Sequence, residues 1–389
     1  MNAANPPASP SHGGETLMPP SRSPWAETWY LLRKNRMAFS GLVIFSIFFG
    51  AAIIGLAVTA GSRPLLDPAQ IRLEEKLRPP LARPDIADSR PEEVPGLGIY
   101  LLGTDNLGRD VFARMLQGAW VSLTVGFVAV GIAVAIGILL GGLAGYYGQQ
   151  YIRISHLLLF MILMASILSV TRGQLTLAGL LLAAAALGVG WLKKYHRDAP
   201  HPLPPVLQWI AWPAMQVDTL IMRAVDIMLC FPSFFLILTV VALLPPSIYN
   251  IMVVIGLTSW MGTTRFVRAE FLSLREYDFV AAARVLGISD VRIIFRHIMP
   301  NAIAPVLVSA TLGIASAMLT EAGLSFLGFG VPPPHATWGN ILSDGRNFIF
   351  DAPWLTFAPG LVILVVVLAF NLFGEGLRDI LNPKPRKRG

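Results

Sequence analysis

The chain has 389 residues, of which 54% are hydrophobic and only 14% are charged. Soluble domains carry about a quarter of their residues as charged side chains, so this balance excludes an ordinary soluble domain and indicates a polytopic membrane protein. The net charge of +7 lies mostly beside apolar runs, as at Arg33, Lys34 and Arg36, which is typical of membrane flanks and argues against a nucleic-acid partner.

Residues 1–24 are rich in Pro, Ser, Gly and Asn and lack the apolar core of a signal peptide, which predicts a disordered tail. Residues 25–60 follow as an N-terminal helix and a first span, because a helix needs about 20 apolar residues to cross a bilayer. The apolar runs predict an all-α protein with eight candidate spans, at 37–60, 118–142, 155–171, 174–192, 218–243, 248–264, 302–325 and 355–374.

The third and fourth candidate spans are short and are joined by a tight turn at Thr171–Gln174. We therefore interpret residues 149–216 as an inserted hydrophobic hairpin. If the hairpin lay on the membrane surface, its apolar residues would be half exposed to water, which is less favourable than burial in lipid. We predict that it crosses, with Arg172 at the outer interface, which makes eight crossings in total.

Basic residues in the short flanks set the orientation of the spans. Arg33 before the first span, Arg153 before the hairpin and the basic tail at 383–389 place both termini in the cytoplasm. The same rule puts the segment 265–300 in the cytoplasm and the loop 61–116 outside.

Residues 326–354 also lie outside in this orientation. They include "LGFGVPPPHATWGN", whose three prolines and several glycines predict an irregular loop. The loop is either an ordinary connection or an extracellular gate or docking surface, and we expect Trp338 at the membrane interface.

Besides Asp218 at the start of one candidate span, three charged residues stand inside candidate spans. Arg223 and Asp226 are three residues apart in one span, and Glu321 lies in another. An isolated charge at the middle of the bilayer costs at least ~2.5 kcal/mol, so these side chains must face protein or water and have partners. We favour an intrahelical Arg223–Asp226 pair that orients its helix over a role for these residues in the substrate pathway.

Gly137, Gly141 and Gly145 recur every four residues and leave one helix face without side chains, which predicts the close approach of another helix. No phosphate-binding GxxxxGK[ST] pattern is found in the chain. The single Cys230 excludes an internal disulfide and a cysteine-based metal cluster. The sequence therefore predicts no cofactor, and ATP, if it is used, is bound by a partner.

The segment "EYDFVAAARVLGISDVRIIFRHIMPN" is basic and lies between two spans. It predicts one helix over Leu274–Leu286 with Gly287 as its stop, and a second over Val291–Met299 that ends before Pro300. The apolar residues of the second helix fall at helical spacing and predict one buried stripe, made of Val291, Ile294, Phe295 and Ile298. The segment is thus a helix–turn–helix elbow, either an interfacial loop or a lever on which a cytoplasmic protein acts.

This elbow resembles the EAA loop of ABC importer permeases, whose pattern is EAA, three residues, Gly, nine residues and I-x-L-P. The alanine pair, the glycine and the proline match at the right spacing, whereas Ala281 replaces the glutamate, His297 the isoleucine and Met299 the leucine. By this resemblance, the residues that couple the chain to an ATPase are Ala281, Ala282, Ala283, Gly287, Arg292, His297 and Pro300.

Further stretches are similar to signatures of the dipeptide/oligopeptide/nickel branch of that family. They are "LLGTDNLGRDVFARMLQGAWVSLTVG", "VDTLIMRAVDIMLCFP" and "EAGLSFLGFGVPPPHATWGNIL". The resemblance covers residues 25–148 and 217–383. It implies a type I ABC importer transmembrane-domain fold, with a permease domain at 117–382 and six core spans plus the hairpin.

The resemblance also implies a function. The chain is expected to be a non-catalytic permease subunit of the bacterial cytoplasmic (inner) membrane that moves di- or oligopeptides by alternating access, with nickel and other solutes left open as substrates. The implied partners are a second homologous permease, two cytoplasmic ABC ATPases that bind the ATP, an extracytoplasmic substrate-binding protein and the lipid membrane. An ion-coupled transporter would predict an internal repeat and an intramembrane enzyme would predict clustered ligands, and the sequence shows neither.

Overall fold

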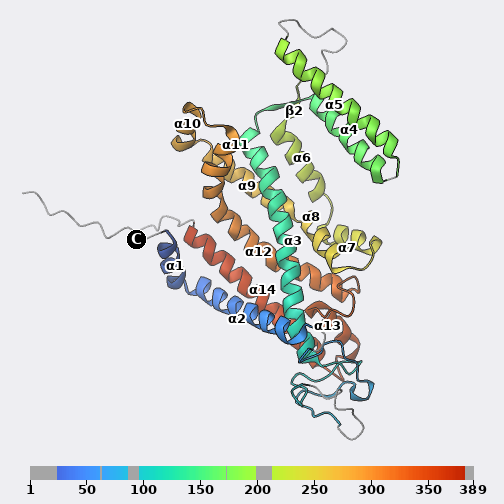
Figure 1. Ribbon diagram of the computed structural model, residues 1–389. Helices are drawn as coiled ribbons and strands as arrows, with labels where there is room; N and C mark the ends of the chain where they lie inside the picture. The colour runs from blue at the N-terminus through green and yellow to red at the C-terminus, as the bar shows by residue number, and fades with distance from the viewer. Residues whose placement is uncertain (1–23, 62–63, 86–95, 172, 199–212, 382–389) are drawn as a thin grey trace, which may run out of the picture.

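The computed structural model describes residues 24–61, 64–85, 96–171, 173–198 and 213–381. The predicted tails at the two ends lie outside these residues except for Pro24, and so does Arg172. The described chain is mostly helical, as predicted (Figure 1). Its α-helices are α1 (Pro24–Lys34), α2 (Arg36–Thr59), α3 (Val111–Tyr147), α4 (Ile154–Thr171), α5 (Leu175–Asp198), α6 (Val217–Leu229), α7 (Ser233–Leu243), α8 (Ile248–Leu257), α9 (Trp260–Leu274), α10 (Asp278–Val285), α11 (Asp290–Ile293), α12 (Met299–Phe326), α13 (Trp338–Gly345) and α14 (Trp354–Leu381).

Four helices of the described chain are long and apolar enough to cross a membrane. They are α2, α3, the continuous helix Asp290–Phe326 and α14. A fifth span is reached if the bent pair of α6 and α7 is counted as one. These five helical segments correspond to the expected spans 37–60, 118–142, 218–243, 302–325 and 355–374, so the polytopic membrane character of the chain is confirmed.

The expected span 218–243 is not one straight helix. α6 ends at Leu229, α7 begins at Ser233, and the two axes are bent by 80°. Pro232 precedes α7 and explains the break, because proline lacks an N–H and its ring clashes with the carbonyl four residues earlier.

The expected span 248–264 is also divided, between α8 and α9. Two hydroxyl side chains stand at the break: Thr258 Oγ1 donates to Val254 O at 2.7 Å, and Ser259 Oγ donates to Ile255 O at 2.6 Å. Such bonds to the preceding turn compete with the helical hydrogen bonds and bend helices. α9 then continues ten residues beyond the predicted end of the span, to Leu274.

α3 is the central helix and packs against α2, α8, α9 and α12 (Figure 1). Its glycine stripe faces α9 as predicted. A Cβ atom at Gly137 would lie 2.6 Å from Thr263 Cβ, and a Cβ at Gly145 would lie 2.5 Å from Phe271 Cβ. Side chains on the stripe would therefore force the two helices apart, and the glycines are what permits their contact.

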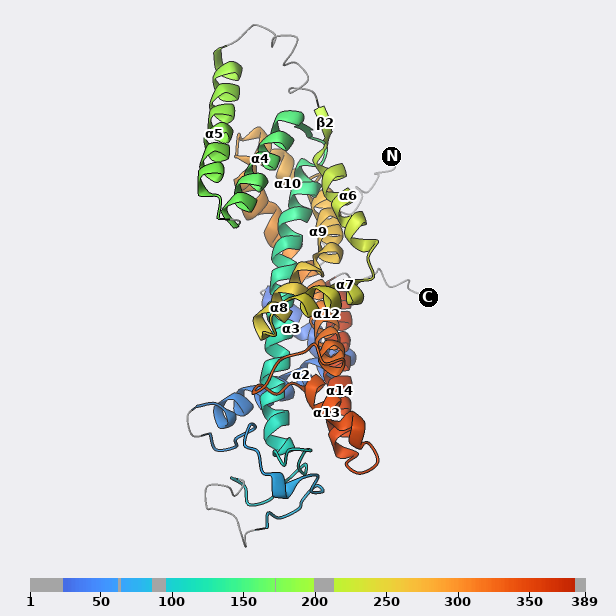
Figure 2. The same cartoon turned by 90° about the vertical axis from the view of Figure 1, so that its right-hand side faces the viewer.

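The buried apolar residues form two clusters. The larger includes Trp338, Ile251 and Leu355 and joins α3 to α8, α12, α13 and α14. The smaller, which we call the inner cluster, includes Phe271 and Ile298 and joins the end of α3 to α9, α10, α11 and the start of α12. Figure 2 shows α13 and the blue loop after α2 at one end of the molecule and α10 near the other. The larger cluster therefore extends to one end of the molecule, and the smaller cluster lies toward the other.

The predicted hairpin is present as α4 and α5, which pack against each other. A short antiparallel ribbon closes its base, with β1 (Tyr151–Arg153) paired to β2 (Pro213–Gln216). Figure 1 shows the hairpin beside the helical bundle, attached through this ribbon. The ribbon strands stand at the two ends of the predicted insert 149–216, so the insert is a structural unit of its own.

Candidate functional site

The first arm of the elbow is α10. It begins at Asp278 and not at the predicted Leu274, which is the last residue of α9, but it ends as predicted at the glycine. Gly287 has a φ of +71°, in the left-handed region that favours glycine. Its N–H donates to Arg284 O at 3.0 Å, and the N–H of Ile288 donates to Ala283 O at 3.1 Å. These two bonds are the Schellman pattern that closes a helix, so the stop follows from local backbone chemistry.

The second arm differs from the prediction. α11 passes into a π-helical turn over Ile294–Ile298 and then directly into α12, so the helix does not end before Pro300. Pro300 is the second residue of α12 and directly follows the π-helical turn, inside the continuous helix Asp290–Phe326. The second arm of the elbow is therefore the start of a span and not a separate short helix.

The π turn also changes which residues are buried. Ile293 and Ile298, five residues apart, are both fully buried, whereas Val291 and Phe295 are 62% and 65% exposed. Hydrogen bonds from residue i to i−5 widen the turn and bring positions five apart onto one face. The predicted stripe at 3.6-residue spacing was therefore wrong for Val291 and Phe295 and right for Ile298.

The elbow consequently has an apolar base and an apolar outer face. Val280 and Ala283 of α10 join Ile293 and Ile298 in the inner cluster. Four other apolar residues of the elbow are exposed, and we call them together the outer face. They are Val285 at the end of α10, Leu286 directly after it, Val291 of α11 and Phe295 of the π-helical turn. Val285 is 88% and Leu286 78% exposed, so the described part of the chain leaves these side chains largely uncovered.

The residues implied by the EAA resemblance are split between the two faces. Ala281 and Ala282 are exposed on α10, and Ala283 is buried. Arg292 is exposed, His297 is half-buried and Pro300 is exposed. Ala281 is therefore exposed at the position of the missing glutamate, and it offers no carboxylate to a partner.

The intramembrane charges pair differently from the expectation. Asp226 Oδ1 lies 2.6 Å from Arg265 Nη2 on α9, and no ion pair joins Arg223 to Asp226 among the described residues. One further pair, Arg268 with Asp218, also bridges α9 and α6, with Nη2 2.7 Å from Oδ2. Hydrogen bonding to Asp218 raises the pKa of Arg268. The two acids therefore fasten α6 to α9 instead of orienting α6 alone.

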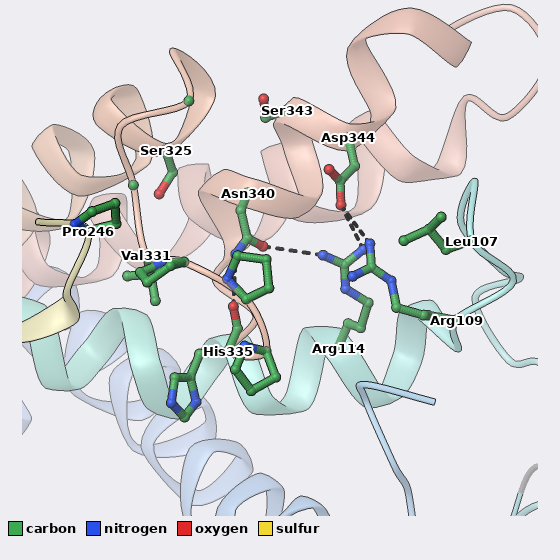
Figure 3. A pocket seen from close by; sticks show the side chains of 15 residues that line it. Leu107, Arg109, Arg114, Pro246, Ser325, Val331, His335, Asn340, Ser343 and Asp344 are labelled. Carbon is green, nitrogen blue, oxygen red and sulfur yellow. Dashed lines mark hydrogen bonds and ion pairs between the residues drawn. The ribbon is translucent and has the colours of Figure 1, made fainter. Parts of the chain in front are cut away.

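A pocket of about 470 Å³, which we call the outer pocket, lies beside α13, at the end of the molecule opposite the elbow (Figure 3). Asp344 accepts from two arginines, with Arg109 Nη2 at 3.1 Å and Arg114 Nη1 at 2.9 Å. Arg114 also donates to Asn340 Oδ1 at 3.4 Å. The remaining wall comes largely from the proline-rich loop and one residue of the α7–α8 connection, namely Val331, Pro332, Pro333, Pro334, His335 and Pro246.

The structure tests the surroundings predicted for Glu321 and Trp338. Glu321 is 1% exposed and accepts from Ser325 Oγ at 2.7 Å and Ser122 Oγ at 3.4 Å, which confirms that it faces protein. Trp338 was expected at the membrane interface, but it is buried in the larger cluster and its Nε1 donates to Met115 O at 3.1 Å.

The loop that contains Trp338 is also more regular than predicted. Its second half forms α13, which a capping box between Thr337 and Asn340 starts. The capping box could have been recognised in the sequence "TWGN", but the neighbouring prolines led to the prediction of an irregular loop.

Comparisons with known proteins agree with this architecture. Residues 209–387 match the family model described as binding-protein-dependent transport system inner membrane component, and residues 23–80 match the N-terminal TM domain of oligopeptide transport permease C. The dipeptide transport system permease protein DppC of Alkalihalophilus pseudofirmus is 36% identical over 362 residues, which cover 93% of this chain and 90% of that protein. DppC of Haemophilus influenzae is 32% identical over 93% of this chain and 96% of its own length. The oligopeptide transport system permease protein OppC of Bacillus subtilis is 28% identical over 99% of this chain and 98% of its own length. The chain therefore belongs to the family of binding-protein-dependent transport system inner membrane components, as a non-catalytic multi-pass permease subunit that works with a separate ATPase and a binding protein.

Proposed function

We propose that the chain is the membrane-spanning permease subunit of an ATP-driven importer of di- or oligopeptides. Separate ATPase subunits drive alternating access, and the permease carries the substrate across the cytoplasmic membrane. The peptide substrate is supported by the relatives, whose names are those of dipeptide and oligopeptide permeases. A second homologous permease completes the channel, and each permease receives one of two ATPases.

The observation that carries the proposal is the outer face of the elbow. Exposed Val285, Leu286, Val291 and Phe295 form an apolar surface on a segment whose other side is firmly buried. Apolar residues exposed together on one surface mark sites of protein–protein contact. The exposed Arg292 and Arg296 flank this face and suit an acidic rim on the partner. We assign the face to the ATPase.

The opposite end of the molecule suits the external binding protein. The outer pocket is open to solvent, and its ion pairs among Arg109, Arg114 and Asp344 hold the loop of residues 96–110 and α13 in one arrangement. We propose that this end receives the binding protein. The basic flanks support a cytoplasmic location of the elbow and of both termini.

We also propose the type I importer fold with six core spans, to which the hairpin of α4 and α5 adds two crossings. Many side chains of the hairpin are apolar and exposed, among them Phe160, Met161, Leu180 and Leu187. The permease family model begins only at residue 209, after the end of α5 at Asp198, which supports an insertion into the common fold.

The crossing is tested by a cysteine at Gly173 in a Cys230→Ala background. If the hairpin spans the bilayer, an impermeant thiol reagent added outside intact cells labels it. Labelling only after the membrane is opened would leave the hairpin on the cytoplasmic side.

The function itself is tested with the whole transporter in lipid vesicles. We expect the wild-type chain to retain the ATPases on purification and to support ATP-dependent uptake of a labelled dipeptide. Phe295→Glu places a charge on the outer face and is expected to abolish ATPase retention. Phe350→Glu is the matched control, because Phe350 is 96% exposed and lies at the other end of the molecule, beyond α13.

Two results would contradict these assignments. Full ATPase retention by Phe295→Glu would remove the elbow from the docking site. ATP-dependent uptake of nickel without uptake of any peptide would overturn the substrate class.

A further inference from the structure

One side chain touches both arms of the elbow. Tyr146, next to the last residue of α3, donates its hydroxyl hydrogen to Asp290 Oδ1 at 2.6 Å. The guanidinium carbon of Arg284 stands 5.4 Å from the centre of the Tyr146 ring, at cation–π distance. Arg284 lies in the last turn of α10 and Asp290 is the first residue of α11, so the two contacts bracket Gly287.

Tyr146 itself is held firmly. Its side chain is 8% exposed and belongs to the inner cluster with Phe271 and Ile298. Its ring meets that of Tyr147 edge to face at 4.8 Å. One residue earlier, Gly145 O accepts from Arg275 Nη1 at 3.1 Å, which ties the end of α9 to the same point of α3. Tyr146 is therefore a fixed point against which the elbow is placed.

The turn of the elbow needs such a fixed point. A Cβ atom at Gly287 would have no neighbour within 4 Å among the described residues, so none of them packs on that side of the turn. The apolar contacts of Val280, Ala283 and Ile293 hold the two arms on the bundle, but apolar burial has no preferred direction. Hydrogen bonds are directional, so the Tyr146–Asp290 bond sets the angle between the arms.

α3 connects this point to the other end of the protein. The helix has 37 residues, which correspond to a length of about 55 Å. Near its first turn, Arg114 binds Asp344 in the wall of the outer pocket, and Met115 O accepts from Trp338. A displacement of α3 at Tyr146 therefore reaches the residues that shape the outer pocket through one continuous helix.

We propose that Tyr146 is a positioning residue for coupling, which fixes the elbow to α3 so that movement of a docked ATPase is transmitted along α3 to the outer end. The proposal rests on the proposed function, because it requires an ATPase on the outer face of the elbow. This role requires no contact of Tyr146 with substrate or ATP. Tyr146 acts through Asp290 and Arg284.

The test uses the whole transporter in lipid vesicles. The measured quantity is the stimulation of ATP hydrolysis by the binding protein with the dipeptide alanyl-alanine, added on the outer side. Tyr146→Phe removes the hydroxyl and keeps the ring under Arg284. We expect the stimulation to fall about tenfold, since a hydrogen bond to a carboxylate biases an equilibrium by roughly that factor. ATPase retention is expected to persist, because the outer face is unchanged.

Two further variants sharpen the test. Tyr249→Phe makes the same chemical change on an exposed residue of α8 and is expected to leave the stimulation as in the wild type. Asp290→Asn keeps an acceptor oxygen but loses the charge, so we expect a smaller loss. If Tyr146 and Asp290 act through one contact, the double variant falls no further than Tyr146→Phe alone.

Several results would overturn the proposal. Normal stimulation in Tyr146→Phe would do so, even if that variant unfolds at a lower temperature, because the role would then be structural only. Loss of the ATPases from Tyr146→Phe would make the residue part of docking instead. The proposed function fails separately, and is recognised when the wild-type chain itself retains no ATPase.

Discussion

Substitution of Gly287 is the most direct perturbation of the elbow, because the turn between its arms lies at this residue. Its φ of +71° is a conformation that costs an L-residue roughly 1–2 kcal/mol and is worst for β-branched side chains. No atom lies within 4 Å of a Cβ built there, so Gly287→Val introduces backbone strain without a steric clash. A strain of about 1–2 kcal/mol corresponds to about a 5- to 30-fold loss in occupancy of the native turn.

We expect Gly287→Val to enter the membrane normally and to lower peptide uptake per ATP hydrolysed by about that factor. Uptake and hydrolysis are measured together in reconstituted vesicles. Gly287→Asn is the first control, because asparagine adopts the left-handed region more readily and should lose little. Gly173→Val is the second, because Gly173 has a φ of +75° and equally open surroundings but lies at the hairpin turn. Unchanged coupling in Gly287→Val, or an equal loss in Gly287→Asn, would refute the reasoning.

The remaining predictions concern nucleotide binding, helix contact and pH. The purified chain is expected to show no saturable binding of an ATP analogue, and micromolar affinity would contradict a separate ATPase. Gly141→Leu should destabilise the chain by about 1–3 kcal/mol in thermal unfolding, because a Cβ there would lie 2.6 Å from Thr264 O, whereas Gly131→Leu, with nothing within 4 Å, should not. Burial raises the pKa of Asp110, the N-cap of α3, so its ionisation costs stability as the pH rises through that raised value. Asp110→Asn keeps the cap and should be at least as stable as the wild type at neutral pH, and this advantage should vanish below pH 3.8; a loss of stability at neutral pH would contradict the argument.

Several features of this protein follow from short stretches of sequence. The long spans α2, α3, α12 and α14 were predictable because about 20 consecutive apolar residues are insoluble in water whatever their neighbours are. The end of α10 was predictable because glycine readily adopts the left-handed backbone conformation that closes a helix, as Gly287 does. The glycine stripe on α3 predicted a close helix contact for the same reason, since the absence of side chains is visible in the sequence.

The sequence did not show which helix would fill that contact or where the long apolar runs would break. The chain bends at Pro232 and at the pair Thr258 and Ser259. These residue types can be read from the sequence, but they also occur inside unbroken membrane helices when neighbouring groups satisfy the freed backbone hydrogen bonds. The π turn in the elbow moved the buried stripe from the predicted positions to Ile293 and Ile298. A single period of 3.6 residues cannot anticipate such a shift of register.

The polar contacts of the candidate site depend on tertiary structure most of all. Asp226 has Arg223 three residues away but pairs with Arg265, which is 39 residues distant in the chain. Tyr146 and Asp290 are 144 residues apart, and nothing in either segment indicates the other. The choice of partner depends on which helices the glycine stripe and the inner cluster bring together. Only the packed bundle therefore places Tyr146 against the elbow, whereas the elbow itself could be found from the spacing of Ala281, Gly287 and Pro300.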